Sequence, residues 1–563
     1  MGKCGLGYGA VMHLGGWLRC IVFITLIYYV NSTISLNKHG ITIIGRKLKT
    51  IFGNKPYVAF YKIPFAEPPV NTLRFKPPEE NHSLFARLIS DFSTPYSNLT
   101  LNDEDRLYLS IFTPQTKNKT ENFPVLVWIH EYSNYHGPDF FIEEEVIIAK
   151  VSFRTDILGF LNTEDEYAKG NMGAKDILMA LKWVRENISY FNGDPNRVKI
   201  MGSGIASTAV ASMLLSPAAE DLFKRAVIFD GSALSPADFR DSKNKVVKKI
   251  YWKLKGRKDK FNKKQLYHIL ANASYHELVS ASYNLYDSSE VRDNQRLINS
   301  FSCSVETEAK GAFMYTHPLI QYESKLINSN VDVIFGYTTL ANLYKLQGLA
   351  SKRELLNYLD YNFQYLLPFE GTPHEYGSIR YIKIRQHIKD FYFLNGTITE
   401  RSLRRYAKYL SDQVIYPLLR QALLHSKISH SNVYLYRFAY HGSINVGWKT
   451  SVPNLNWTGA TLGDEICYLF KCKSKTDDYK RHEASNERHF VSKIVRLLAN
   501  FAKYGNPTPQ LSDNILGNLQ WNPLKRNEKL QVMNLGRRFR MIDVPEEKRM
   551  TFWDQLRKEL LQN

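Results

Sequence analysis

Short apolar runs rich in β-branched residues recur along this chain, and they constrain its fold more than any other feature of the sequence. Each run has the length and composition of a buried strand. The five runs span residues 124–130, 146–151, 197–201, 225–229 and 331–335. A helical pattern over 174–190 lies between two of them, and Asn192-Gly193 follows it as a stop signal. Strands that alternate with helices predict an α/β protein whose central sheet is mostly parallel and covered by helices on both faces.

The first 32 residues differ from the rest of the chain. Residues 20–30 form a mainly apolar segment with few charges before it. A transmembrane helix needs ~20 apolar residues, whereas the core of a signal peptide needs ~7–15. We therefore expect a signal peptide over 1–32 and a secreted, extracellular protein with no integral membrane segment in its mature chain. An uncleaved anchor is the alternative.

Residues 33–563 contain no internal repeat and no linker rich in Pro, Gly or Ser. The composition, with 44% hydrophobic and 13% aromatic residues, is typical of a globular protein with a large core. We expect one domain over 33–563.

In a secreted protein, cysteines can form disulfides and some asparagines can carry glycans. Three cysteines follow the signal peptide, and free buried thiols are favoured over a Cys467–Cys472 bridge, with Cys303 left over. Asn-x-Ser/Thr sequences are candidate glycosylation sites in a secreted chain. The candidates are Asn81, Asn98, Asn118, Asn272, Asn395 and Asn456.

Positive charge is concentrated in one segment. The chain carries a net charge of +20, and residues 243–264 hold ten lysines and one arginine against a single acid, Asp259. A solvated helix face is the ordinary explanation of such a segment. In an extracellular protein it also suggests a polyanion site, for a sulfated glycan or an anionic membrane surface before nucleic acid. The candidate residues are Lys248, Lys249, Lys253, Lys255, Arg257, Lys258, Lys260, Lys263 and Lys264.

The junction between the strand at 197–201 and an apolar helix at 206–215 has the pattern of a nucleophile elbow. In such an elbow a strand turns sharply into a helix, and small residues two before and two after the apex allow close packing. Gly202 and Ala206 are suitably small. The apex, where a nucleophilic serine would stand, is Gly204.

Several further segments occur in the order found in one known family. They are Leu73-Arg-Phe-Lys-Pro-Pro78, Glu104-Asp-Arg-Leu-Tyr-Leu109, Gly170-Asn-Met-Gly173, Phe191-Asn-Gly-Asp-Pro-Asn-Arg-Val198 and Asn500-Phe-Ala-Lys-Tyr-Gly-Asn-Pro507. With the elbow, they make the chain resemble the type-B carboxylesterase and cholinesterase family over nearly its whole mature length. The resemblance implies an α/β hydrolase fold, a deep gorge above the elbow, and ester hydrolysis by a serine, a histidine and a carboxylate.

The catalytic positions of that family are replaced in this chain. By the resemblance, the serine falls on Gly204, the carboxylate on Ala341 and the histidine on Leu462. The glycines of the family's oxyanion segment fall on Glu131, Tyr132 and Ser133, which would crowd the oxyanion hole. Losing a triad nucleophile or base costs about 10⁶ in kcat. The sequence therefore predicts a protein that is not an enzyme and that has no cofactor and no metal site.

Three functions are compatible with such a scaffold. The first is extracellular recognition or adhesion, as in family members that resemble neuroligins, neurotactin and glutactin, with an extracellular protein or a sulfated glycan as the partner. The second is a carrier or sequestering protein for a small hydrophobic molecule held in the gorge. The third is a carboxylic ester hydrolase with a relocated active site. Nucleic acid is not expected as a partner.

Overall fold

A computed structural model describes most of the chain after the predicted signal peptide. The described residues are 33–38, 41–81, 89–91, 104–115, 122–130, 136–238, 244–346, 349, 353–447, 457–481, 486–526 and 528–561. The signal peptide predicted over 1–32 lies outside them, as do Glu131, Tyr132 and Ser133. The candidate glycosylation sites Asn98, Asn118 and Asn456 lie outside them too.

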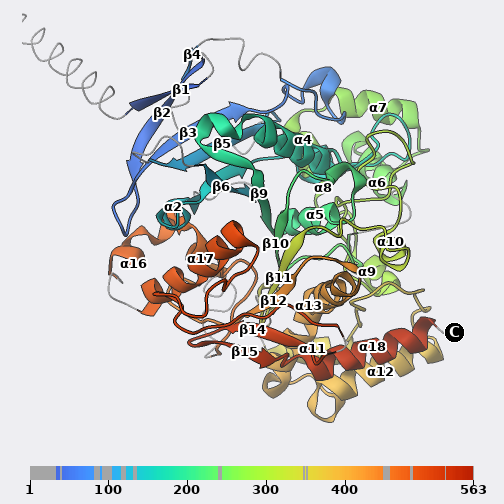
Figure 1. Cartoon of the computed structure of the whole chain (residues 1–563). Helices are drawn as coiled ribbons and strands as arrows, with labels where there is room; N and C mark the ends of the chain where they lie inside the picture. Colours follow the sequence, from blue (N-terminus) through green and yellow to red (C-terminus); the bar gives the residue numbers. More distant parts are fainter. Residues whose placement is uncertain are drawn as a thin grey trace, which may run out of the picture.

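Strands from both halves of the described chain form one large sheet (Figure 1). In chain order its strands are β1 (Thr33–Lys38), β2 (Ile41–Lys49), β3 (Pro56–Pro64), β4 (Ile89–Asp91), β5 (Tyr108–Pro114), β6 (Phe123–Ile129), β8 (Ile147–Val151), β9 (Gly193–Ser203), β10 (Arg225–Phe229), β11 (Asp332–Thr338), β12 (Val433–Phe438), β14 (Gln531–Leu535) and β15 (Phe539–Asp543). Their spatial order is β1-β2-β3-β5-β8-β6-β9-β10-β11-β12-β14-β15, with β4 beside β2. The strands from β8 to β14 in that order run parallel, whereas the pairs at both ends are mostly antiparallel. The predicted mostly parallel sheet is confirmed.

Helices connect the strands and cover the sheet. They are α2 (Asp139–Glu143), α3 (Asp156–Phe160), α4 (Met172–Asn187), α5 (Ile205–Met213), α6 (Asn244–Lys255), α7 (Lys263–Asn272), α8 (Tyr275–Ser282), α9 (Ser288–Asn294), α10 (Pro318–Glu323), α11 (Arg353–Tyr361), α12 (Ile379–Tyr392), α13 (Leu403–Ile428), α15 (Ile466–Leu469), α16 (Thr476–Arg481), α17 (Asn486–Tyr504) and α18 (Glu547–Leu561). Short 3-10 helices include η2 (Ile188–Phe191) and η4 (Leu343–Leu346). The helix predicted over 174–190 is thus α4 extended by η2.

Alternate side chains of each central strand enter different cores, which explains the unbroken apolar runs. On β6, Val125 and Val127 pack in the same cluster as residues of α4 and α5. Leu126 and Trp128 point the other way and pack with residues of α2 and α17. Both faces of the sheet are therefore buried, and Figure 1 shows α4 and α5 on one side of the strands with α2 and α17 on the other.

Cys467 and Cys472 form a disulfide, so the expectation that free thiols are favoured is wrong for this pair. The five-residue separation brings their Cα atoms to 5.3 Å, within the range that a disulfide spans. The bridge links α15 to the two-residue strand β13 (Lys471–Cys472), which pairs with β7 (His136–Gly137). Cys303 is free and buried, as a leftover thiol would be.

Among the described residues, no helix is both long enough and apolar enough to span a bilayer. Of the candidate glycosylation sites that the structure describes, Asn272 and Asn395 are exposed, and Asn81 is half-buried.

Candidate active site

The turn between β9 and α5 has the backbone of a nucleophile elbow. Gly204 is the N-cap residue of α5, and its backbone has φ 66° and ψ −134°. Residues other than glycine rarely adopt this backbone conformation. Gly202 lies where strand and helix come closest, because a Cβ there would stand 2.7 Å from the carbonyl oxygen of Ala206. The elbow predicted from the sequence therefore exists, with glycine at its apex.

Replacing Gly204 by alanine is expected to lower the free energy of unfolding by about 1–3 kcal/mol, because the added Cβ makes the apex conformation strained. The control is Gly371→Ala, where the nearest side-chain atom would be 4.0 Å from the new Cβ. This control should change stability by less than about 1 kcal/mol. Urea unfolding of both variants measures the difference, and equal effects would show that the elbow carries no strain.

The three positions that the resemblance assigned to a triad lie around one cavity. Ala341 follows β11, and its carbonyl oxygen accepts a hydrogen bond of 3.3 Å from the backbone N–H of Leu462. Gly204, Ala341 and Leu462 all line the same pocket, whose volume is about 350 Å³. That volume is within the range of small-molecule sites. The fold therefore assembles these positions although their side chains are not those of a serine esterase.

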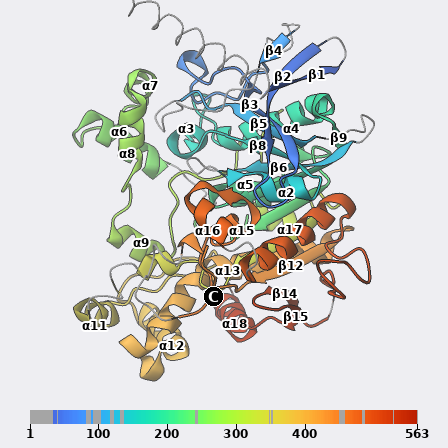
Figure 2. The same ribbon diagram turned by 90° about the vertical axis from the view of Figure 1, so that its left-hand side faces the viewer.

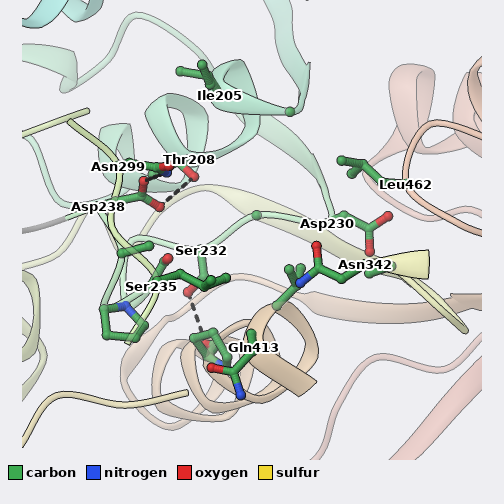
Figure 3. A pocket seen from close by; sticks show the side chains of 18 of the residues that line it. Ile205, Thr208, Asp230, Ser232, Ser235, Asp238, Asn299, Asn342, Gln413 and Leu462 are labelled. Carbon is green, nitrogen blue, oxygen red and sulfur yellow. Dashed lines mark hydrogen bonds between the residues drawn. The ribbon is translucent and has the colours of Figure 1, made fainter. Parts of the chain in front are cut away.

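Asp230 is the carboxylate that this pocket holds beside the elbow. It follows β10, the strand next to β9, and Figure 3 shows it between Leu462 and Asn342. Its Oδ1 accepts a hydrogen bond of 2.8 Å from the backbone N–H of Thr338, and its Oδ2 accepts one of 2.8 Å from the Thr338 hydroxyl. These two donors fix the carboxyl group while it faces the cavity.

Burial raises the pKa of Asp230 to about 7, and the nearby negative charge of Asp464 adds to the rise. Glu465 is almost completely buried, and its pKa is raised by burial and by the charge of Asp230. Two buried carboxyl groups that repel each other cannot both ionise easily, so the pair retains a proton at neutral pH. Such a pair can release or take up a proton near physiological pH.

The rest of the described pocket wall combines polar and apolar side chains. Asp238 accepts hydrogen bonds from Thr208, at 3.4 Å, and from Asn299, so its charge is held by neutral donors (Figure 3). Lys345, on η4, also lines the pocket, and burial lowers its pKa to about 8. The cavity thus offers one ammonium group and two carboxyl groups to a bound molecule.

The other predicted site residues are distributed as follows. Of the oxyanion segment, only His130 is described; its ring lies 6.4 Å from that of Trp128, nearly parallel. The nine basic candidates lie on α6, α7 and the loop between them. Four of them form ion pairs within the protein: Lys249 with Glu290, Lys255 and Arg257 with Asp259, and Lys263 with Asp165. That these nine residues form a polyanion site stays a prediction.

Asp230 is a carboxylate of this pocket that the sequence reasoning did not single out. A signal for it was present, because Asp230 directly follows the apolar run at 225–229. Side chains at the carboxyl ends of neighbouring parallel strands gather at one edge of a sheet, where ligands bind in open α/β folds. The order of the strands was needed to place Asp230 next to the elbow.

Comparisons with known proteins agree with this fold. The carboxylesterase family model matches residues 33–553. The chain is 26% identical to a juvenile hormone esterase of Tribolium castaneum, over 93% of this chain and 91% of that protein. It is also 26% identical to a cocaine esterase of Homo sapiens, over 88% of this chain and 87% of that protein. A crystal structure of juvenile hormone esterase from Manduca sexta, with OTFP covalently attached, has a TM-score of 0.73 at 20% identity and covers 93% of this chain and 99% of that one.

These relatives contradict the prediction that the protein is not an enzyme, because they are named as esterases and the similarity extends over most of their length. That prediction was wrong because replacement of a serine, a histidine and an acid excludes one mechanism only. The same pocket keeps an acid–base group, Asp230, at the end of a different strand. Since the family model spans the described fold almost from end to end, the chain belongs to the carboxylesterase family.

Proposed function

We propose that the protein binds carboxylic esters in this pocket and hydrolyses them with a water molecule activated by Asp230. The observation that carries the proposal is that the pocket brings the Asp230 carboxyl group, the elbow apex Gly204 and the first residue of α5, Ile205, to one cavity. The names of the relatives support ester as the class of substrate.

The reaction follows from the groups present. The carboxylate of Asp230 removes a proton from water while the water oxygen attacks the carbonyl carbon of the ester. Negative charge develops on the carbonyl oxygen, and the amino end of α5, which begins at Ile205, favours charge there through the helix dipole. Asp230 then gives the proton to the alkoxide oxygen as the C–O bond breaks. An acid and an alcohol leave, and Asp230 is ionised again.

The pocket offers polar groups to a bound ester besides apolar surface. Polar side chains such as Ser235, Asn342 and Gln413 line it beside the apolar ones. Lys345 supplies a positive charge that favours the carboxylate product.

The rate should be modest. Losing the nucleophile of a typical esterase lowers kcat from ~10 s⁻¹ to ~10⁻⁵ s⁻¹. A positioned general base contributes about 10²- to 10⁴-fold. Turnover of about 10⁻³ to 10⁻¹ s⁻¹ is therefore expected, which is far below that of a serine esterase.

The test is hydrolysis of short-chain and aromatic carboxylic esters by the purified protein, with and without a serine-directed phosphonate. We expect turnover above that of buffer, and no inhibition, since Gly204 offers no hydroxyl group to the phosphonate. Gly204→Ser is the comparison variant; because Leu462 cannot accept the serine proton, this variant should gain neither rate nor labelling. A folded protein without turnover on the whole panel would disprove the proposal.

A second candidate function is extracellular recognition by a secreted form of the protein. The observation that favours it is the excess of exposed lysines on α6 and α7, because such a charged surface attracts a partner of opposite sign. Secretion and glycosylation of the exposed Asn272 and Asn395 remain part of this candidate.

A further inference from the structure

Seven cations on α6, α7 and the loop that joins them are exposed, and one of them, Lys253, donates a hydrogen bond to the carbonyl oxygen of Tyr283. We call the other six the basic surface; it consists of Lys245, Lys248, Arg257, Lys258, Lys260 and Lys264. Figure 2 shows α6 and α7 standing out from the side of the molecule together with α8. The basic surface is therefore open to a large partner.

The fold itself separates the outward cations from the inward ones. Val246, Val247 and Ile250 of α6 are buried in the main core, as are Leu266 and Leu270 of α7. Because these apolar residues lie on one side of each helix and are buried, the opposite side of the helix faces solvent. The inward lysines that form ion pairs are Lys249, Lys255 and Lys263.

Five of the six outward cations lack a compensating acid among the described residues. Within the described residues, none of the five lysines of the basic surface forms an ion pair with a carboxylate. Arg257 lies 3.5 Å from the Oδ2 of Asp259, an oxygen that already binds Lys255. An ordinary solvated helix face intersperses both signs of charge, which lowers the repulsion between like charges. This surface lacks that arrangement, so a polyanion would relieve its repulsion.

The chemistry of the surface favours a sulfated polysaccharide over nucleic acid. Binding of single strands uses exposed aromatic rings on which bases stack. The rings within this surface are engaged internally: Trp252 Nε1 donates to the carbonyl oxygen of Asp259 at 2.9 Å, and Phe261 packs edge-on against Tyr251 at 5.4 Å. Five of the six cations are lysines, which act as point charges, whereas arginine is the residue that binds phosphate with fork geometry.

We propose that the basic surface is a binding site for a sulfated polysaccharide. The site is separate from the pocket at the elbow, since none of its residues lines that pocket. It therefore does not depend on the proposed ester hydrolysis, and each proposal can fail without the other.

The test uses the full-length protein and heparin as the probe. Wild-type protein should remain on a heparin column above about 0.5 M salt, where exposed charges farther apart than a few ångströms are screened from each other. In solution, the affinity for heparin should fall by about 10³-fold between 50 and 200 mM salt, as for a polyelectrolyte that makes about six ionic contacts. Elution near physiological salt would disprove the site.

A triple variant, Lys258→Glu with Lys260→Glu and Lys264→Glu, should bind heparin at least about 10-fold more weakly and elute at lower salt. Its control carries the same change of net charge at three exposed lysines elsewhere, as Lys310→Glu, Lys383→Glu and Lys548→Glu. Retained heparin binding in the control and loss in the triple variant supports the proposal. Equal loss in both would mean that net charge alone binds heparin. Tighter binding of RNA or DNA than of heparin by wild-type protein would assign the surface to nucleic acid.

Discussion

Replacing Asp230 by asparagine is expected to lower ester turnover by about 10²- to 10⁴-fold, because it removes the group that takes the proton from water. In wild-type protein the base must be ionised, and burial raises the pKa of Asp230 to about 7. Turnover should therefore rise with pH and level off above about 7. The variant should lose this pH dependence together with the rate, and pH-rate profiles of both proteins measure it.

The same substitution should stabilise the fold at neutral pH. Because the folded-state pKa of Asp230 is raised from 3.8 to about 7, the folded protein holds a proton that the unfolded chain releases between these values. Stability therefore falls as pH rises through this interval, by up to about 4 kcal/mol. Asparagine carries no charge near Asp464 and Glu465, so Asp230→Asn removes this loss, and the Thr338 hydroxyl can turn to accept from the new amide.

Asp238→Asn is the matched control for that variant. Asp238 lines the same pocket, but its carboxylate is occupied by hydrogen bonds from Thr208 and Asn299. Its replacement keeps both contacts, because the Thr208 hydroxyl can turn to accept from the new amide, and it should leave the pH dependence of turnover intact. If Asp230→Asn instead keeps the rate and destabilises the fold, Asp230 has a structural role only and the proposed mechanism is wrong.

Replacing Asp176 by alanine is expected to lower the free energy of unfolding by about 3–5 kcal/mol, because it leaves Arg154 charged and buried without a partner. Arg154 follows β8 and Asp176 lies on α4; the two side chains are only 2% and 0% exposed. Their contact is bidentate, with Nη2 to Oδ1 at 2.6 Å and Nε to Oδ2 at 2.8 Å. The ion pair therefore connects α4 to the segment that follows β8.

The control for this prediction is Glu166→Ala, which breaks an exposed ion pair of 2.7 Å with Lys169. An exposed pair contributes about 0–1 kcal/mol, so this variant should unfold close to the wild-type urea midpoint. Comparison of the two midpoints measures the effect of burial. A small shift for Asp176→Ala would mean that water reaches Arg154 in the variant and solvates its charge.

Local patterns in the sequence predicted the sheet, the main helices and the elbow. The apolar runs at 225–229 and 331–335 became β10 and β11, and the Gly202 to Ala206 junction turned from strand to helix as its small residues indicated. These features depend on residues adjacent in the chain, since strand and helix periodicity and the conformational freedom of glycine act over a few residues.

The tertiary structure decided which side chains share a site. The sequence and its resemblance to a family predicted that Gly204, Ala341 and Leu462 stand at the positions of a triad, and the sequence by itself placed eleven cations in one short segment. It did not determine that Asp230 faces the same cavity, because that depends on the pairing of β10 between β9 and β11 and on burial, which sets the pKa. It also did not show that Lys263 pairs with Asp165, 98 residues away in the chain. Strand order, burial and long-range ion pairs arise only when distant segments pack together, and they decide which carboxyl groups line the pocket and which lysines form ion pairs within the protein.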